Sequence, residues 1–141
     1  LVVKKGSKYA NATSLADFSG AKVTAQLNTF HYSVIDQIPG VEKQAAMDNF
    51  PAMRVALQAG TIDAYVSELP EALSAQAANS DFVMVKLTDG FKVSPEDIQT
   101  AVGVKKDSPL TKQINEALKT ISSEERQQIM QDAIKNQPAA E

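Results

Sequence analysis

A carboxylate stands where a buried strand is expected to end. Glu68 follows the apolar residues 62–66, which are typical of a strand, and a helical pattern begins at once behind it. A carboxylate in this place could receive a cationic group through a charge-assisted hydrogen bond, which is about twice as strong as a neutral one. A structural interpretation stays open beside it. Glu68 would then interact with the dipole of the following helix, with Ser67 as its N-cap.

Asn28 and Thr29 form a second candidate site, at the start of a helix expected over residues 30–38. The first N–H groups of a helix have no intrahelical partner and favour an anion, and the Thr29 hydroxyl could add a donor. The structural interpretation is that one of the two side chains caps the helix. His31, the one histidine of the sequence, is in a position more typical of a polar surface residue than of a catalyst.

Several classes of site are excluded by the residues that the sequence lacks. There is no cysteine, so disulfides, thiol catalysis and Cys-metal sites are ruled out. The motifs GxSxG, GxGxxG and GxxxxGK[ST] are absent, as is any spacing typical of metal ligands. We therefore expect no catalytic residues, no metal and no cofactor. The net charge of −3 gives no electrostatic basis for binding nucleic acid, and no apolar run is long enough to span a bilayer.

Strand and helix patterns alternate along most of the chain, which predicts an α/β fold with a mostly parallel sheet flanked by helices. Strands are expected at residues 1–5, 21–26, 41–46, 61–66, 81–87 and 100–106, and helices at 11–20, 30–38, 49–60, 67–79, 108–121 and 124–137. The last residues, 138–141, are expected to be disordered. In such sheets ligands bind at the carboxyl ends of the strands, where both candidate sites lie.

Three blocks of the sequence, in this order, carry a family resemblance. They are "SLADFSGAKVTAQLNTF", "MRVALQAGTIDAYVSELPEAL" and "TAVGVKKDSPLTKQINEALKTI", and the second is the most specific. Together they resemble the extracellular solute-binding proteins of family 3, the polar amino-acid receptors of bacterial ABC importers. The resemblance implies a periplasmic-binding-protein-like fold of type II, in which two lobes close over an amino acid.

The resemblance also implies how the chain is divided. Residues 6–99 would form the second lobe, and residues 100–141 would return to the first lobe as a hinge strand and C-terminal helices. Residues 1–5 would be the other hinge strand. The main part of the first lobe would lie outside this sequence, together with the arginine and the aromatic residues that usually hold the ligand.

For the candidate residues, the resemblance implies that Glu68 takes the α-ammonium of the amino acid, where the family usually has aspartate. Thr29 would donate to the α-carboxylate, and Asn28 replaces the usual glycine, which it can do because asparagine tolerates a left-handed backbone.

The function implied is substrate binding for an ABC amino-acid importer, with the transmembrane permease subunits as partners. The ligand would be a polar or basic amino acid, and the location a cell-surface lipoprotein or the periplasm. Two alternatives stay open: a ligand-sensing domain of a receptor, and a periplasmic dehydratase-like enzyme on the same fold. We also expect the isolated chain to self-associate, since an apolar stripe over residues 108–136 would lack its partner.

Overall fold

The computed structural model describes residues 1–136 of the 141. The tail expected to be disordered, residues 138–141, lies outside the described residues. The chain divides into two compact units, which are treated separately below: Leu1–Asp97, and a second unit that begins at Ile98.

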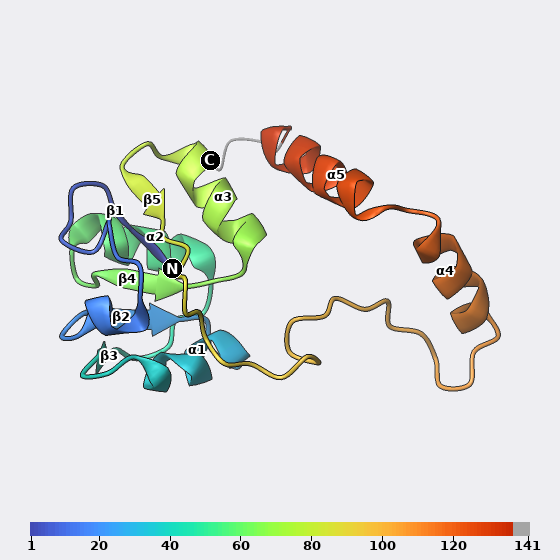
Figure 1. Cartoon of the computed structure of the whole chain (residues 1–141), viewed down its shortest axis with the longest axis horizontal. Coiled ribbons are helices and arrows are strands. Elements are labelled where there is room, and N and C mark those ends of the chain that lie inside the picture. The colour runs from blue at the N-terminus through green and yellow to red at the C-terminus, as the bar shows by residue number, and fades with distance from the viewer. Residues whose placement is uncertain (137–141) are drawn as a thin grey trace. The chain divides into compact units, whose positions relative to one another are not determined.

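Within the described residues, the first unit is built on a five-stranded sheet with the order β3-β2-β4-β1-β5 (Figure 1). The strands are β1 (Val2–Lys4), β2 (Lys22–Ala25), β3 (Glu42–Lys43), β4 (Ala64–Val66) and β5 (Phe82–Met84). Strand β2 pairs in parallel with both β3 and β4, whereas β1 runs antiparallel to its neighbours β4 and β5. The predicted α/β fold with a mostly parallel sheet is confirmed.

The helices of this unit are α1 (Phe30–Val34), α2 (Phe50–Ala59) and α3 (Leu69–Ala78), with 3-10 helices η1 (Leu15–Phe18) and η2 (Ile35–Gln37). The α-helix expected over residues 30–38 is thus shorter. It ends at Val34, and residues 35–37 continue as the 3-10 helix η2. The cause follows directly in the sequence. Ile38 precedes Pro39 and adopts an extended conformation, φ −82° and ψ 116°, because proline disfavours a helical backbone in the residue before it.

Helix α2 begins and ends as its sequence predicts. The Asn49 side chain accepts a hydrogen bond from the Ala52 N–H at 2.9 Å, Pro51 occupies the first turn, and Gly60 closes the helix with φ 76°. Met53 and Leu57 are fully buried, as their helical spacing indicates. These contacts fix α2 against the sheet.

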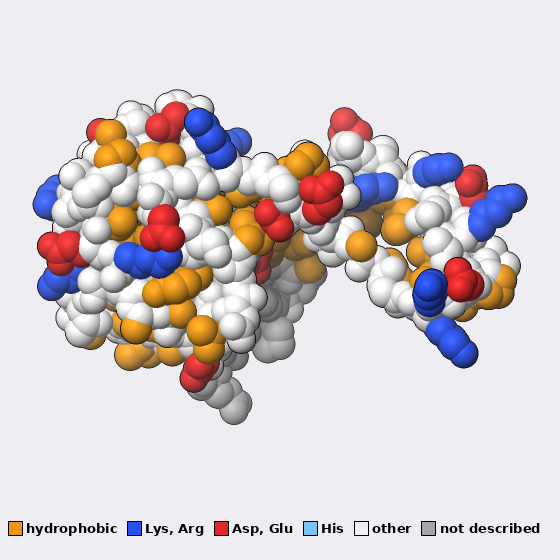
Figure 2. Space-filling model, turned by 90° about the horizontal axis from the view of Figure 1, so that it is seen from below, with side chains coloured by type: hydrophobic (Ala, Val, Ile, Leu, Met, Phe, Trp, Pro, Cys, Tyr) orange, Lys and Arg blue, Asp and Glu red, His pale blue; other side chains and the backbone are white. Residues whose placement is uncertain are grey.

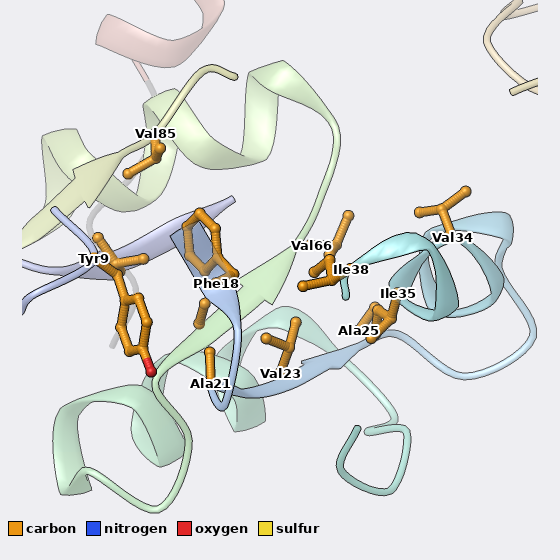
Figure 3. Close-up of a cluster of buried hydrophobic side chains, with 12 residues drawn as sticks. Tyr9, Phe18, Ala21, Val23, Ala25, Val34, Ile35, Ile38, Val66 and Val85 are labelled. Carbon is orange, nitrogen blue, oxygen red and sulfur yellow. The ribbon is translucent and has the colours of Figure 1, made fainter. Parts of the chain in front are cut away.

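Side chains of alternate strand residues enter two separate cores, one on each face of the sheet. In β4, Ala64 and Val66 lie in one core and Tyr65 lies in the other. Figure 3 shows the first core, where Phe18, Val23, Ala25, Ile35 and Ile38 pack between the sheet and the segments η1, α1 and η2. The second core joins the sheet to α2 and α3 through Val2, Met53, Leu57, Tyr65, Ala72, Ala75 and Phe82. The first unit is therefore a three-layer α/β structure.

The second unit contains two helices, α4 (Leu110–Lys119) and α5 (Ser123–Lys135), within the residues described. Helix α5 begins with the predicted capping box. The Ser122 hydroxyl accepts from the Glu125 N–H at 3.1 Å, and the Glu125 carboxylate accepts from the Ser122 N–H at 2.8 Å. Neither helix has a buried residue. Figure 2 shows hydrophobic side chains at the surface among charged ones, and Leu110, Leu118, Ile129 and Met130 are among the exposed residues.

The strand expected at residues 100–106 is not formed, so this prediction is wrong. Residues 101–105 have no regular secondary structure. A strand is stabilised by hydrogen bonds to a neighbouring strand, and the described sheet, which ends at β3 on one side and β5 on the other, takes in no strand from this segment. The alternation of apolar residues in "TAVGVKK" indicates a strand only where a partner is available.

Candidate functional site

Two turns meet at one edge of the sheet. Strands β2 and β4 are adjacent and parallel, with Ala25 paired to Val66, so their carboxyl ends lie side by side. Residues 26–29 follow β2, and Ser67 and Glu68 follow β4. The topology thus brings together the residues that the sequence analysis singled out.

The turn after β2 is held by backbone and side-chain hydrogen bonds. Asn28 has φ 60°, the left-handed conformation that the resemblance requires at this position. Thr29 occupies the N-cap position of α1, but its side chain makes no capping bond. Its hydroxyl instead donates to the Gln26 carbonyl at 2.7 Å. The Leu27 N–H donates to the Met47 carbonyl at 2.8 Å, which connects the turn to the loop between β3 and α2.

Thr29 is therefore the N-cap residue, as the capping interpretation predicts, but its side chain does not form the capping bond. The Thr29 hydroxyl proton is used within the turn, so the hydroxyl is not free to donate to a ligand as well. The Tyr32 N–H donates to the Thr29 carbonyl at 3.2 Å, so the N–H groups of Phe30 and His31 are the donors that the turn presents to an anion.

Glu68 is the N-cap residue of α3, with φ −68° and ψ 161°. The structural interpretation expected the N-cap at Ser67, which is one residue too early. The Ser67 hydroxyl donates to the Glu68 carbonyl at 3.2 Å instead of accepting from the helix. The Glu68 side chain makes no capping bond either and is 47% exposed. Its carboxylate is thus not used to cap the helix that it precedes, and it is partly accessible to solvent.

His31 lies opposite this carboxylate, with 3.7 Å between its Nε2 and the Glu68 Oε2. The imidazole is 14% exposed and is packed against the Phe30 ring, with 4.1 Å between the ring centroids. Burial lowers the pKa of His31 below its ordinary value, although the Glu68 charge acts in the opposite direction. Sequence reasoning left His31 out of the site. The signal available was its place in the first turn of α1, which begins just after Thr29.

A second group of polar side chains links α2, β4 and α3. Arg54 donates to both oxygens of Glu71, from Nε at 2.9 Å and from Nη2 at 2.8 Å, and the Tyr65 hydroxyl donates to Glu71 Oε1 at 3.2 Å. Burial raises the pKa of Glu71, and Arg54 opposes that shift. Burial also raises the pKa of Tyr65. No local sequence pattern indicates this network, since its members come from three different elements.

A pocket of about 260 Å³ opens near the start of α3, and Glu68 is not among the residues that line it. Its lining includes Ser67 and Leu69, the neighbours of Glu68, together with Met84, Leu87 and Phe91.

Neither a metal centre nor a membrane span is found in the part of the chain that the structure describes. No group of three His, Cys, Asp or Glu side chains among residues 1–136 could hold a metal ion. Within the same residues, every helix is too short or too polar to cross a membrane.

No family model and no curated protein sequence matches the chain significantly, but solved structures do. An amino acid ABC transporter substrate-binding protein from Streptococcus pneumoniae Canada MDR_19A, solved bound to L-arginine, is 25% identical with a TM-score of 0.77, over 95% of this chain and 55% of that one. The P235GK mutant of ArgBP from T. maritima has a TM-score of 0.69 at 23% identity, over 96% of this chain and 56% of that one. Domain 2 from TmArgBP is 26% identical with a TM-score of 0.54, over 62% of this chain and 95% of that one.

The chain spans about half the length of the larger structures that it matches, and most of the length of the single domain. The family resemblance drawn from the sequence is thereby confirmed: the chain is similar to the substrate-binding proteins of amino acid ABC transporters, and its first unit has the fold of one of their lobes.

Proposed function

We propose that this chain is part of the substrate-binding component of an ABC amino-acid importer, and that Glu68 binds the α-ammonium of the amino acid. The observation that carries the proposal is the Glu68 carboxylate itself. It does not cap its helix, it is half exposed, and it lies at the carboxyl edge of the sheet close to the start of α1. An α-amino acid needs an anionic and an anion-binding group close together, and this edge offers both.

The α-carboxylate of the ligand would be met by the first N–H groups of α1. Asn28 supports this role because its left-handed conformation, φ 60°, turns the chain from β2 into the helix. Thr29 acts as a positioning residue, since its hydroxyl closes the turn onto Gln26 at 2.7 Å. The role of Thr29 is therefore indirect, in contrast to the direct donation that the resemblance implies.

In the proposed protein, residues 6–99 form the second lobe, and residues 1–5 and 100–141 connect it to a first lobe. The match to an isolated domain 2 over 95% of its length supports this division. Closure of two lobes over the ligand would exclude water, and the interaction between Glu68 and the ammonium would strengthen accordingly.

The ligand class is a polar or basic amino acid. The S. pneumoniae relative was solved with L-arginine bound, which makes L-arginine the first compound to test.

The partners of such a protein are the ABC permease subunits, to which it delivers its ligand. It works outside the cytoplasmic membrane, either as a cell-surface lipoprotein or in the periplasm. A ligand-sensing domain would bind the same amino acid without delivering it to a permease.

The enzymatic alternative also requires a test, because His31 and Glu68 lie 3.7 Å apart and an imidazole and a carboxylate can act as base and acid. We propose binding without turnover. Incubation of the two-lobed protein with L-arginine, followed by mass analysis of the free compound, should recover it unchanged.

The decisive experiment compares two ligands by calorimetry in the two-lobed protein: L-arginine, and 5-guanidinopentanoic acid, which lacks only the α-amino group. We expect the second compound to bind at least about 30-fold more weakly, because it leaves the enclosed carboxylate without a partner. In the Glu68→Gln variant the two compounds should bind with more similar affinities. Equal affinities in the unmodified protein would contradict the assignment of Glu68.

A further inference from the structure

The Glu68 carboxylate faces a side chain of this same chain that can itself become a cation. His31 Nε2 lies 3.7 Å from Glu68 Oε2, which is beyond the length of an N–H···O hydrogen bond but within the range of an ion pair. The imidazole is mostly buried against Phe30 and so is held in place, whereas the carboxylate is 47% exposed and has room to move. A small movement of Glu68 would complete the contact.

The charge of the imidazole decides whether that contact is attractive. Burial is the largest influence on the pKa of His31 and lowers it below its ordinary value. At neutral pH the imidazole is therefore neutral, and the Glu68 charge is available to another cation. Acidification charges His31 and creates an imidazolium directly beside the carboxylate.

Few other charges act on His31. The α-ammonium of Leu1 opposes its protonation, and burial lowers the pKa of that ammonium to about 6. Where residues precede Leu1, this group becomes a peptide N–H, and Glu68 remains the charged group that acts on the imidazole. On the neighbouring elements η2 and β3, Asp36 and Lys43 pair with each other at 2.9 Å.

We propose that His31 belongs to the ligand site, and that its imidazole and the cationic group of the ligand compete for the carboxylate of Glu68. The inference rests on the proposed function, since it concerns the same carboxylate. The two cations exclude each other because a single carboxylate cannot fully neutralise both at close range. Where His31 is protonated, below its pKa, ligand binding therefore expels a proton from the imidazole, and acidification weakens ligand binding.

The first test uses this chain alone, because its single histidine gives one assignable imidazole signal in a proton NMR titration. We expect Glu68→Gln to lower the pKa of His31, since it removes the charge that favours the imidazolium. Asp36→Asn is the matched control. It also removes one carboxylate, but one that is paired with Lys43 and is not among the groups that influence His31. An unchanged His31 pKa in Glu68→Gln would overturn the proposal, whether or not the chain binds an amino acid.

The second test measures the affinity of the two-lobed protein for L-arginine at about pH 7.5 and about pH 5.5. The α-ammonium and α-carboxylate of a free amino acid keep their charges over this range. We expect binding to be about two- to tenfold weaker at the lower pH, and this difference to disappear largely in His31→Gln, whose side chain stays neutral.

The outcomes separate this proposal from the proposed function. Binding of L-arginine with the same pH dependence in the unmodified protein and in His31→Gln would overturn the competition and leave the proposed function intact. Absence of binding of any amino acid at both pH values would overturn both. If His31→Gln fails to fold, the titration of the Glu68→Gln variant still decides whether the charge of Glu68 acts on the pKa of His31.

Discussion

Arg54 and Glu71 join α2 to α3 through two parallel hydrogen bonds of 2.9 and 2.8 Å, in the bidentate geometry of the strongest ion pairs. The Glu71 side chain is 9% exposed and that of Arg54 is 21% exposed, so the pair is largely shielded from water. Glu71 lies in the first turn of α3, the helix that Glu68 precedes. The pair therefore anchors the end of α3 at which the candidate ligand site lies.

Glu71→Gln should destabilise the fold because it leaves the Arg54 charge partly buried without its partner. Loss of one partner of a fully buried pair costs roughly 3–5 kcal/mol, and partial exposure of Arg54 reduces our expectation to about 1–3 kcal/mol. Denaturant unfolding of the chain measures the change. Glu116→Gln, which breaks the exposed pair with Lys119, is the control and should change stability by less than about 0.5 kcal/mol. Equal effects of the two variants would contradict a structural role for the buried pair.

Glu68→Gln should lower the ligand affinity without lowering the stability of the fold. It keeps the shape of the side chain and removes the charge that the ligand ammonium would meet, so the affinity of the two-lobed protein should fall at least about 30-fold. The melting temperature should barely change, since the carboxylate is half exposed and does not cap α3. Calorimetry and a thermal melt of the same sample give both values. Unchanged affinity for every amino acid that the unmodified protein binds would show that Glu68 is not the ammonium partner.

Thr29→Val should weaken the turn after β2. The change removes the hydrogen bond from the hydroxyl to the Gln26 carbonyl, which is worth roughly 0.5–1.5 kcal/mol. We expect a loss of stability of this size and a smaller loss of affinity than in Glu68→Gln, because the N–H groups of α1 are misplaced but not removed. Thr29→Ser retains the hydroxyl and serves as the control in both measurements. A large loss of affinity with unchanged stability would instead favour direct contact between the hydroxyl and the ligand.

The isolated chain should self-associate through its second unit. Helices α4 and α5 bury no residue within the described part of the chain, and their apolar side chains, among them Leu110 and Ile129, are exposed. Light scattering over a range of concentrations should show a species larger than a monomer. A strict monomer whose helices α4 and α5 are protected from hydrogen exchange would disprove this expectation.

The isolated chain should also bind free amino acids very weakly. It presents the partners of the ligand from one lobe, and no closure can exclude water from them. Titration calorimetry with L-arginine should detect no micromolar binding. Micromolar affinity in the isolated chain would contradict the two-lobe interpretation and would place the whole site within these residues.

The sequence by itself determined the features that depend on local backbone chemistry. Asn49, Pro51 and Gly60 predicted the limits of α2, and Ser122 with Glu125 predicted the start of α5, because caps act within one turn of the helix. The alternation of strands and helices predicted the α/β class, and the positions of Asn28, Thr29 and Glu68 after two strands predicted a shared edge.

The tertiary structure decided what depends on partners that are distant in the sequence. The strand expected at residues 100–106 is absent, because a strand requires a neighbour that a local pattern cannot supply. The Arg54–Glu71 pair and the contact between His31 and Glu68 likewise join different elements. Their ionisation depends on burial and on nearby charge, which only the packed sheet and helices determine.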